Sequence, residues 1–150
     1  MALTVQDAGL KNGWRSGLEE AIGAQLDRLH VDYTYEKLAI PFLQPAKPRK
    51  YTPDYIITSN GIIIETKGRF VTADRQKHIL VKAQHPDLDI RFVFSNANQR
   101  ISKQSATTYG MWAQQKGFKY ASKSVPANWL YEAPNVASLA AIARLQGSKK

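Results

Sequence analysis

Three charged residues beside two apolar runs are the clearest candidates for chemistry in this sequence. Asp54 follows a proline at the start of one run, and Glu65 and Lys67 come directly after Ile62-Ile63-Ile64. Because side chains two positions apart on a strand lie on the same face, Glu65 and Lys67 are expected side by side, next to the hydrophobic core. Two carboxylates and a lysine on one face are suited to phosphate chemistry with a hard cation.

The residues that carry these charges predict a β-hairpin. They read DYIITSNGIIIETK, and the dipeptide Asn60-Gly61 is typical of a two-residue turn between strands. A turn of this kind sets Asp54 opposite Lys67 and diagonal to Glu65, all on one face. Opposite Cβ atoms are about 5 Å apart and diagonal ones about 7–8 Å, so both carboxylates can reach one cation.

Two interpretations of this group remain open at the level of the residues. In the first, the acids bind a cation that lowers the pKa of a bound water, and Lys67 orients that water or stabilises charge on phosphorus. In the second, Asp54 and Lys67 form a structural ion pair across the hairpin, and Glu65 is solvated at the strand end. A β-bulge would change the register in either case.

Composition and charge narrow the class of protein. The chain has 150 residues, which predicts one domain, and its net charge of +9 favours a polyanionic partner such as nucleic acid. The absence of cysteine excludes disulfides and thiolate metal sites. No apolar run approaches the roughly 20 residues of a membrane-spanning helix, and the N-terminus has no hydrophobic secretory core, so no membrane association is expected.

The first helix is expected at residues 17–30. The segment RSGLEE contains a capping-box pattern at Ser16 and Glu19, and apolar residues follow at helical spacing. That apolar stripe consists of Leu18, Ile22, Leu26 and Leu29. On a helical wheel Glu19 lies at the edge of the stripe, whereas Glu20 points to solvent.

The remaining elements indicate a mixed α/β fold. We expect a strand over 31–42, the hairpin over 54–67, a helix over 72–84 capped by Thr72 or Asp74, a strand over 89–95, a short helix over 109–116, a strand over 118–122 and a helix over 135–146. In the strand over 89–95, Ile90, Phe92 and Phe94 are expected on one face and Arg91 and Val93 on the other. The connector LQPAKPRKYTPD holds three prolines and is expected to be a stiff, extended arm. The three histidines show no spacing typical of zinc ligands, and the tryptophans are expected to pack.

These motifs resemble a known group of nucleases. Pro53-Asp54 and Glu65-Thr66-Lys67 match the signature of the PD-(D/E)xK superfamily, whose restriction-endonuclease-like core has the order αβββαβ. The chain more closely resembles one family within it, phage endonuclease I, the Holliday-junction resolvases of T-odd-type podoviruses. The matching stretches are RSGLEE, YTPDY…NGIIIETKG, DRQKHILVKAQHPDLDIRFVFS and TTYG…GFKYA…VPANW. They span residues 14–132, whereas the tail at 133–150 carries little likeness.

The resemblance implies an activity and a set of site residues. The activity is resolution of four-way junctions and other branched DNA by metal-dependent phosphodiester hydrolysis, in the cytoplasm of the infected bacterial host. Asp54, Glu65 and the backbone carbonyl of Thr66 are implied as metal ligands, and Lys67 as the catalytic lysine. Glu19 is implied to help bind a second ion. The implied cofactor is Mg²⁺, two ions per site, with Mn²⁺ also supporting activity.

The resemblance also implies a domain-swapped homodimer. The proline-rich segment at about 43–50 would bridge the two halves, and each active site would combine Glu19 of one chain with the hairpin of the other. Candidate DNA contacts are Arg15, Arg49, Lys50, Arg69 and Arg75, each of which is also an ordinary surface cation by itself. Together, such cations predict binding that weakens steeply with salt. The alternatives are a restriction- or repair-type nuclease acting on linear duplex DNA, and a non-catalytic junction-binding protein.

Overall fold

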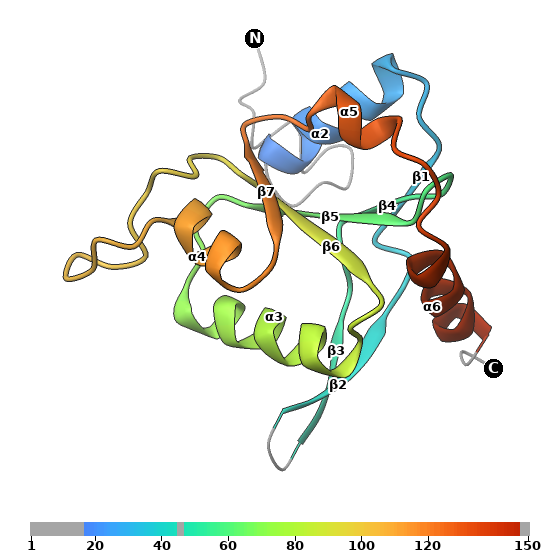
Figure 1. The fold of residues 1–150 in the computed structure, drawn as a ribbon. Coiled ribbons are helices and arrows are strands. Elements are labelled where there is room, and N and C mark those ends of the chain that lie inside the picture. Colours follow the sequence, from blue (N-terminus) through green and yellow to red (C-terminus); the bar gives the residue numbers. More distant parts are fainter. Residues whose placement is uncertain (1–16, 45–46, 148–150) are drawn as a thin grey trace, which may run out of the picture.

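A mixed, five-stranded β-sheet forms the centre of the computed structural model, which describes residues 17–44 and 47–147 (Figure 1). The sheet strands, in their order across the sheet, are β1 (Tyr33–Tyr35), β4 (Tyr55–Ile57), β5 (Ile62–Lys67), β6 (Asp89–Phe94) and β7 (Lys119–Ser122). Strand β4 runs antiparallel to both of its neighbours, β1 and β5, whereas β5, β6 and β7 run parallel. A separate two-stranded sheet pairs β2 (Ile40–Gln44) with β3 (Lys47–Tyr51).

Helices cover both faces of the five-stranded sheet. The helices are α2 (Gly17–Arg28), α3 (Thr72–Gln84), α4 (Tyr109–Gln115), α5 (Ala127–Leu130) and α6 (Val136–Gly147). One hydrophobic cluster joins the sheet to α3, α4 and α6, and a second cluster joins the other face to α2 and α5 (Figure 1). Apart from the inserted β2–β3 pair, the elements from α2 to β6 follow the expected order αβββαβ. The fold class predicted from sequence is therefore confirmed.

The apolar run before Glu65 is explained by burial on both faces of the sheet. Ile63 packs in the cluster under α3, whereas Ile62 and Ile64 pack in the cluster under α2. Strands with parallel neighbours and two covered faces need such continuous apolar sequence. In β6 the predicted alternation also holds, since Phe92 and Phe94 belong to the first cluster and Val93 to the second.

The strand expected over 31–42 is wrong in one respect, because the chain leaves the sheet at Glu36. That residue has φ of +50°, and its backbone N–H donates to the carbonyl of Asp54 at 3.0 Å. The result is two strands, β1 in the main sheet and β2 outside it. The turn places the Glu36 backbone directly against the residue at the start of the candidate site.

The proline-rich segment is extended, as predicted, but in the single chain it does not form an open arm. Leu43 pairs with Pro48, and Gln44 with Lys47, so β2 and β3 form an antiparallel hairpin around residues 45–46, which lie outside the described part of the chain. The Gln84 side chain holds this hairpin to α3 through two 2.6 Å hydrogen bonds with the backbone of Leu43.

Two further helix details differ from expectation. Leu29 is 39% exposed, because α2 ends at Arg28 and its buried stripe ends at Leu26. At α3 neither Thr72 nor Asp74 acts as the cap. Val71 occupies the cap position without a side-chain hydrogen bond, and the Thr72 hydroxyl instead accepts a 3.0 Å hydrogen bond from the Arg75 guanidinium. The predicted cap at Ser16 lies outside the described residues.

His78 on α3 is a buried residue of the aromatic core rather than a surface group. Its side chain is 0% exposed, and its ring lies 4.9 Å from that of Tyr51 and 4.8 Å from that of Phe92, centroid to centroid. Neither ring nitrogen has a hydrogen-bond partner among the described residues. Burial lowers the pKa of His78 well below its usual value, and the charges of Lys67 and Lys77 lower it further.

We expect His78→Leu to reduce the loss of stability in acid. As the pH falls below about 6.5, the unfolded chain binds a proton at His78 and the folded chain does not. That difference costs about 1.4 kcal/mol per pH unit until the folded pKa is reached. Denaturant unfolding of the wild type and the variant between about pH 5 and 8 measures this slope. His30→Asn is the control, because exposed His30 has φ of +54°, which Asn tolerates. An unchanged acid slope in His78→Leu would contradict the expectation.

Candidate active site

The β4–β5 hairpin brings Asp54 and Glu65 together, but in a register that the sequence did not predict. Tyr55 pairs with Ile64, and Ile56 with Ile63. Asp54, one residue before β4, is therefore level with Glu65 and not with Lys67. The predicted Asp54–Lys67 pairing is wrong by two residues, and the two acids are closer in register than the two-residue turn implied.

The register changes because the turn is anchored to distant parts of the chain. The buried Asn60 side-chain amide donates to the Trp129 carbonyl at 2.9 Å, and its carbonyl accepts from the Ile62 N–H at 3.1 Å. Gly61, at φ of +80°, donates its N–H to the Ile57 carbonyl at 2.8 Å. These bonds close a loop over residues 58–61, wider than the two-residue turn that Asn-Gly favours in an isolated hairpin.

Asp54 is buried and oriented by its neighbour across the hairpin. The side chain is 6% exposed, and Oδ2 accepts hydrogen bonds from the Thr66 N–H at 2.9 Å and from Thr66 Oγ1 at 2.7 Å. Thr66 therefore contributes both its backbone amide and its hydroxyl to fixing the carboxylate. The role expected for the Thr66 carbonyl, as a metal ligand, stays a prediction.

Glu65 is a buried carboxyl whose charge is only partly compensated. Tyr51 donates its phenol hydrogen to Oε1 at 2.8 Å, and Lys67 Nζ lies 3.5 Å from Oε2. Burial raises the pKa of Glu65 to about 8, the nearby charge of Asp54 adds to the rise, and Lys67 and Tyr51 oppose it. A cation bound between Asp54 and Glu65 would supply the missing positive charge.

Lys67 lies between two acids that come from different elements. Nζ is 3.5 Å from Glu65 Oε2 on its own strand and 3.4 Å from Asp74 Oδ1 in the first turn of α3. Burial lowers the pKa of Lys67, but the charges of Glu65, Asp74 and Asp54 outweigh burial and the pKa is raised. The group is therefore a fixed ammonium ion. The sequence predicts Asp74 only as a helix cap, because it lies on another element and no local spacing links it to Lys67.

Glu19 lines the same cleft as the hairpin residues, although α2 covers the sheet face opposite to the one that α3 covers. Glu19 is 6% exposed, as expected for the edge of the helix stripe, and Glu20 is more exposed. Tyr35 donates its hydroxyl to the Glu19 carboxylate, and Tyr55 donates to the Glu19 backbone carbonyl at 2.7 Å. The sequence prediction that separated Glu19 from Glu20 is therefore confirmed in position.

A third acid, which the sequence analysis missed, completes a carboxylate cluster. One carboxylate oxygen from each of Glu19, Glu36 and Asp54 lies within 4.8 Å of the others. Oxygen ligands at this spacing suit Mg²⁺ or Mn²⁺. Nothing in the local sequence marks Glu36, because it reaches the site only through the turn that separates β1 from β2.

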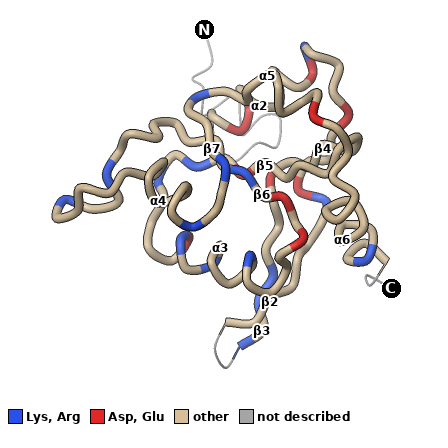
Figure 2. The backbone as a smooth tube through the Cα atoms, in the orientation of Figure 1, with Lys and Arg blue, Asp and Glu red and all other residues tan. Residues whose placement is uncertain are grey.

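A cleft of about 300 Å³ contains Asp54, Glu65, Lys67 and Glu19, although Glu36 does not line it. Its lining consists of Glu19, Lys50, Tyr51, Thr52, Asp54, Glu65, Thr66, Lys67 and Lys77. A larger groove of about 790 Å³ runs between the β2–β3 hairpin and α3, and Lys50 and Lys77 line both spaces. The site therefore opens toward a surface that carries positive charge (Figure 2).

The cations expected to bind DNA lie in different settings. Arg49 and Lys50 are exposed on β3, and Arg69 is exposed just after β5. Arg75 has a structural contact, because its guanidinium donates to the Phe70 carbonyl and to Thr72 Oγ1. Arg15 lies outside the described residues. Contact with DNA stays a prediction for all five.

Comparison with known proteins identifies the family. A model of the family described as phage endonuclease I matches residues 1–149. The chain belongs to this family. It is 43% identical over 119 residues to Endonuclease I of Escherichia phage T7, which covers 79% of each chain. It is also 43% identical over 113 residues to Endodeoxyribonuclease 1 of Enterobacteria phage T3, or 75% of this chain and 74% of that relative.

Membership of the phage endonuclease I family confirms the resemblance and makes this chain a phage endonuclease. The family match extends to residue 149 and so includes the tail, where the motifs showed little likeness. Among the helices that the structure describes, none is long and apolar enough to cross a membrane.

We expect Glu65→Gln to stabilise the protein in the absence of divalent ions at pH 8. Because the folded pKa is raised to about 8 from an ordinary 4.5, this carboxyl contributes stability below pH 4.5 that is lost as the pH rises through 8. The amide has no such loss. The melting temperature in chelator should therefore rise by at least about 2–4 °C at pH 8, the shift that 1 kcal/mol gives, with a smaller difference at pH 5. Glu20→Gln, beside the site on α2, should change little. A lower melting temperature for Glu65→Gln at pH 8 would refute the argument.

Proposed function

We propose that this phage endonuclease is a divalent-metal-dependent endodeoxyribonuclease that resolves four-way junctions and other branched DNA. The observation that carries the proposal is the burial of Asp54 and Glu65 beside Lys67 in one cleft of a protein of net charge +9. A buried acid whose charge is only partly compensated destabilises the folded protein. Such acids are found mainly at functional sites, where catalysis or ligand binding requires them. A bound cation would neutralise the acids of this cleft, and a phosphate diester would neutralise the cation and the lysines beside it.

The residues present fit two hard cations. Asp54 and Glu65, with the carbonyl of Thr66, would hold one ion, and Asp54 with Glu19 and Glu36 would hold the other. The fit rests on the donor set, which is all oxygen, and on a Glu65 carboxyl whose pKa of about 8 would fall on binding a cation. When bound, Mg²⁺ or Mn²⁺ would neutralise the phosphodiester and lower the pKa of a coordinated water.

Lys67 supplies the fixed positive charge of the proposed reaction. Asp74 and Glu65 hold its ammonium from two sides at 3.4 and 3.5 Å, so its position is defined before DNA binds. From there it would orient the attacking water or stabilise the charge that develops on phosphorus. In-line attack of water on phosphorus would break the bond to the 3′-oxygen, which leaves and takes up a proton, so that the products carry a 5′-phosphate and a 3′-hydroxyl.

DNA would be bound through its backbone and shape rather than through base edges. The supporting observation is the groove beside the site, which carries Arg49, Lys50 and Lys77 but one acid, Asp74. The net charge of +9 adds to the attraction. The proposed compartment is the cytoplasm of the infected bacterium, where phage DNA is found.

We propose that the active form is a domain-swapped homodimer. Domain swapping reuses between two chains the contacts that one closed chain makes within itself. If the β2–β3 connection opens, β2 of one chain pairs with β3 of the other, and α2 brings Glu19 to the partner's hairpin. The two-fold symmetry of such a dimer would match a junction that must be cut on two strands.

Cleavage of an immobile four-way junction tests the activity. With Mg²⁺ present, we expect paired, symmetric nicks near the branch point of the labelled junction, and none in a linear duplex of matched sequence. Glu65→Ala should lower the rate by at least about 100-fold, because removing a metal ligand costs no less than the roughly 10–100-fold lost when a residue behind a ligand is changed. Glu20→Ala should cut like the wild type. Equal cutting of the linear duplex would favour a restriction- or repair-type nuclease, and binding without cutting would favour a junction-binding protein.

Mixing two inactive variants tests the swapped dimer. If Glu19 acts in the partner's site, refolding Glu19→Ala together with Glu65→Ala produces heterodimers with one intact and one doubly defective site. The mixture should then nick one strand of the junction, although each variant alone is inactive. Co-refolded Glu19→Ala and Lys67→Ala should complement in the same way, whereas Glu65→Ala with Lys67→Ala should not, because both changes lie on the same half. If the first mixture stays inactive while the wild type is a dimer, the swap is wrong.

A further inference from the structure

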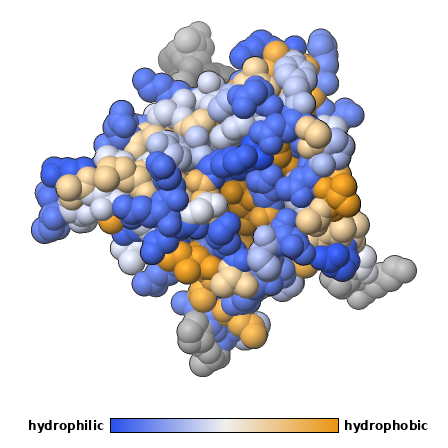
Figure 3. Space-filling view, in the orientation of Figure 1, coloured by the Kyte–Doolittle hydropathy of each residue, from blue (hydrophilic) through white to orange (hydrophobic). Residues whose placement is uncertain are grey.

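A protruding loop between β6 and α4 is not used by the proposed active site. We call residues 96–108 the finger. It extends from the body on the left of Figure 1 and forms the protrusion on the left of Figure 3, with hydrophilic residues at its end. Residues 102–104 and 106 in its outer part are exposed.

The finger has a defined conformation in spite of its exposure. Arg100 and Thr108 form an antiparallel bridge, the Ile101 N–H donates to the Thr107 carbonyl at 2.9 Å, and the Tyr109 N–H donates to the Gln99 carbonyl at 2.8 Å. Its base is fixed to the body, since Ile101 packs against the main hydrophobic cluster. A loop that is already ordered loses little further conformational entropy when it binds a partner.

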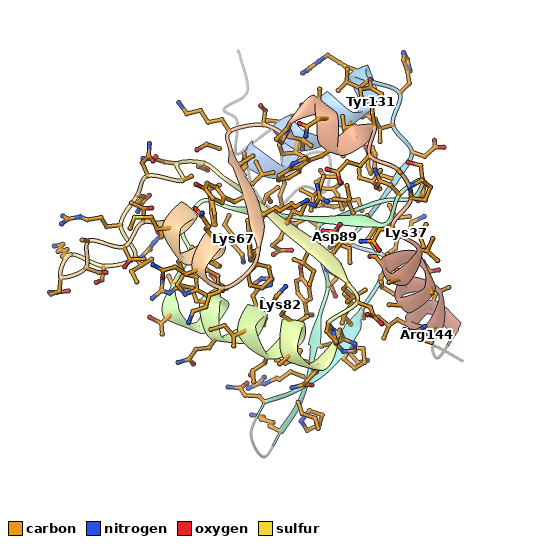
Figure 4. The ribbon with its side chains drawn as sticks, in the orientation of Figure 1. Lys37, Lys67, Lys82, Asp89, Tyr131 and Arg144 are labelled. Atoms are coloured by element: carbon orange, nitrogen blue, oxygen red, sulfur yellow. The ribbon has the colours of Figure 1, made fainter. Side chains whose placement is uncertain are left out.

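The base of the finger lies beside the proposed catalytic lysine. Lys67 at the end of β5 is paired in register with Phe94 at the end of β6. The N–H of Ser95 then donates to the Lys67 carbonyl at 3.0 Å, immediately before the finger begins. In Figure 4 the labelled Lys67 lies on the side of the body from which the finger extends, and Arg144 lies on the opposite side. The finger therefore leaves the sheet at the end of β6 that lies beside Lys67.

The charge of this region has one sign. Residues 90–131 contain no Asp or Glu, and their cations are Arg91, Arg100, Lys103, Lys116, Lys119 and Lys123. The two on the finger, Arg100 and Lys103, have no carboxylate within 4.0 Å in the described part of the chain. Figure 2 shows the finger with blue positions and no red ones. The field of the finger is therefore attractive to a polyanion.

The chemistry of the finger argues against a protein partner. None of the exposed large hydrophobic residues of the described chain lies between residues 96 and 108. Protein interfaces are built around buried aromatic and aliphatic anchors, which the finger lacks. Its Asn, Gln, Ser and Thr side chains, with two cations, are instead the groups that contact phosphate and sugar in DNA complexes.

We propose that the finger is a second DNA-binding element, which contacts the sugar–phosphate backbone of one duplex arm beyond the scissile phosphate. This inference rests on the proposed function. A hairpin with about six residues on each side reaches at most about 20 Å, which is roughly six steps of 3.4 Å along a strand. The finger thus extends the bound length of DNA away from the metal-binding cleft and adds affinity without reading sequence.

Salt-dependent binding of a labelled four-way junction tests the finger. The measurement uses full-length protein carrying Glu65→Ala, so that DNA is not cut, from about 50 to about 200 mM salt. Replacing both cations, Arg100→Gln with Lys103→Gln, should weaken binding about tenfold or more at the lower salt. It should also reduce the slope of log Kd against log salt by about two, one for each lost phosphate contact. Lys103→Glu alone, at the exposed end, should weaken binding further than Lys103→Gln.

The matched control removes the same charge elsewhere. Arg28→Gln with Arg144→Gln changes two exposed cations at the ends of α2 and α6, away from the finger. This control should keep the wild-type slope within one unit. Equal losses in the control and the finger variant would show that only net charge matters and would overturn the inference. If the wild type cuts junctions and the finger variant binds them equally well, the finger inference alone fails. If the wild type neither binds nor cuts branched DNA, the proposed function is wrong, and the inference about the finger, which rests on it, is wrong as well.

Discussion

Burial of the Glu65 carboxylate is the constraint on which the site depends. Strand β5 is covered on both faces, so any charge at its end must leave water. Tyr51 and Lys67 compensate this charge in part, and the pKa still rises to about 8. The fold therefore holds a carboxyl that is stable alone only when protonated, beside a second buried acid. Such an arrangement reduces stability in exchange for a strong preference for a cation.

A second buried charge in the same sheet shows what full compensation looks like. Arg91 on β6 is 2% exposed, and its guanidinium bonds to Asp89 at 2.9 Å and to Glu132 at 2.6 and 2.8 Å. It also lies 5.2 Å from the centre of the Trp129 ring. The pKa of Arg91 is raised and those of both acids are lowered, so every member keeps its charge. The charges of this network are compensated within the protein, whereas the negative charge of Glu65 is compensated fully only if a cation binds.

The inserted β2–β3 hairpin connects the site with the rest of the molecule. Tyr51, the last residue of β3, donates to Glu65 and packs on His78 of α3, and Lys50 before it lines the cleft. Opening this hairpin in a dimer would keep β3 and its Tyr51 with the same chain's β5. The half of the molecule that would exchange carries Glu19 and Glu36. The proposed swap would thus divide the carboxylates of the second metal position between the two chains.

The sequence by itself determined the class of the fold and most of the site. Alternation in β6, the apolar run in β5 and the capping pattern before Glu19 are local signals, since each depends on spacing along one element. The hairpin pattern was sufficient to predict Asp54, Glu65 and Lys67 as neighbours, whereas the place of Glu19 beside them came from the family resemblance. The register of the hairpin, and the presence of Glu36 and Asp74, were decided by tertiary structure alone. Asn60 obtains its partner 69 residues along the chain, at Trp129, and that hydrogen bond widens the turn against its local preference. No local pattern in the sequence encodes this bond. The Asn60 amide and the Trp129 carbonyl come together, and lose their contact with water, only when the chain packs α5 against the sheet.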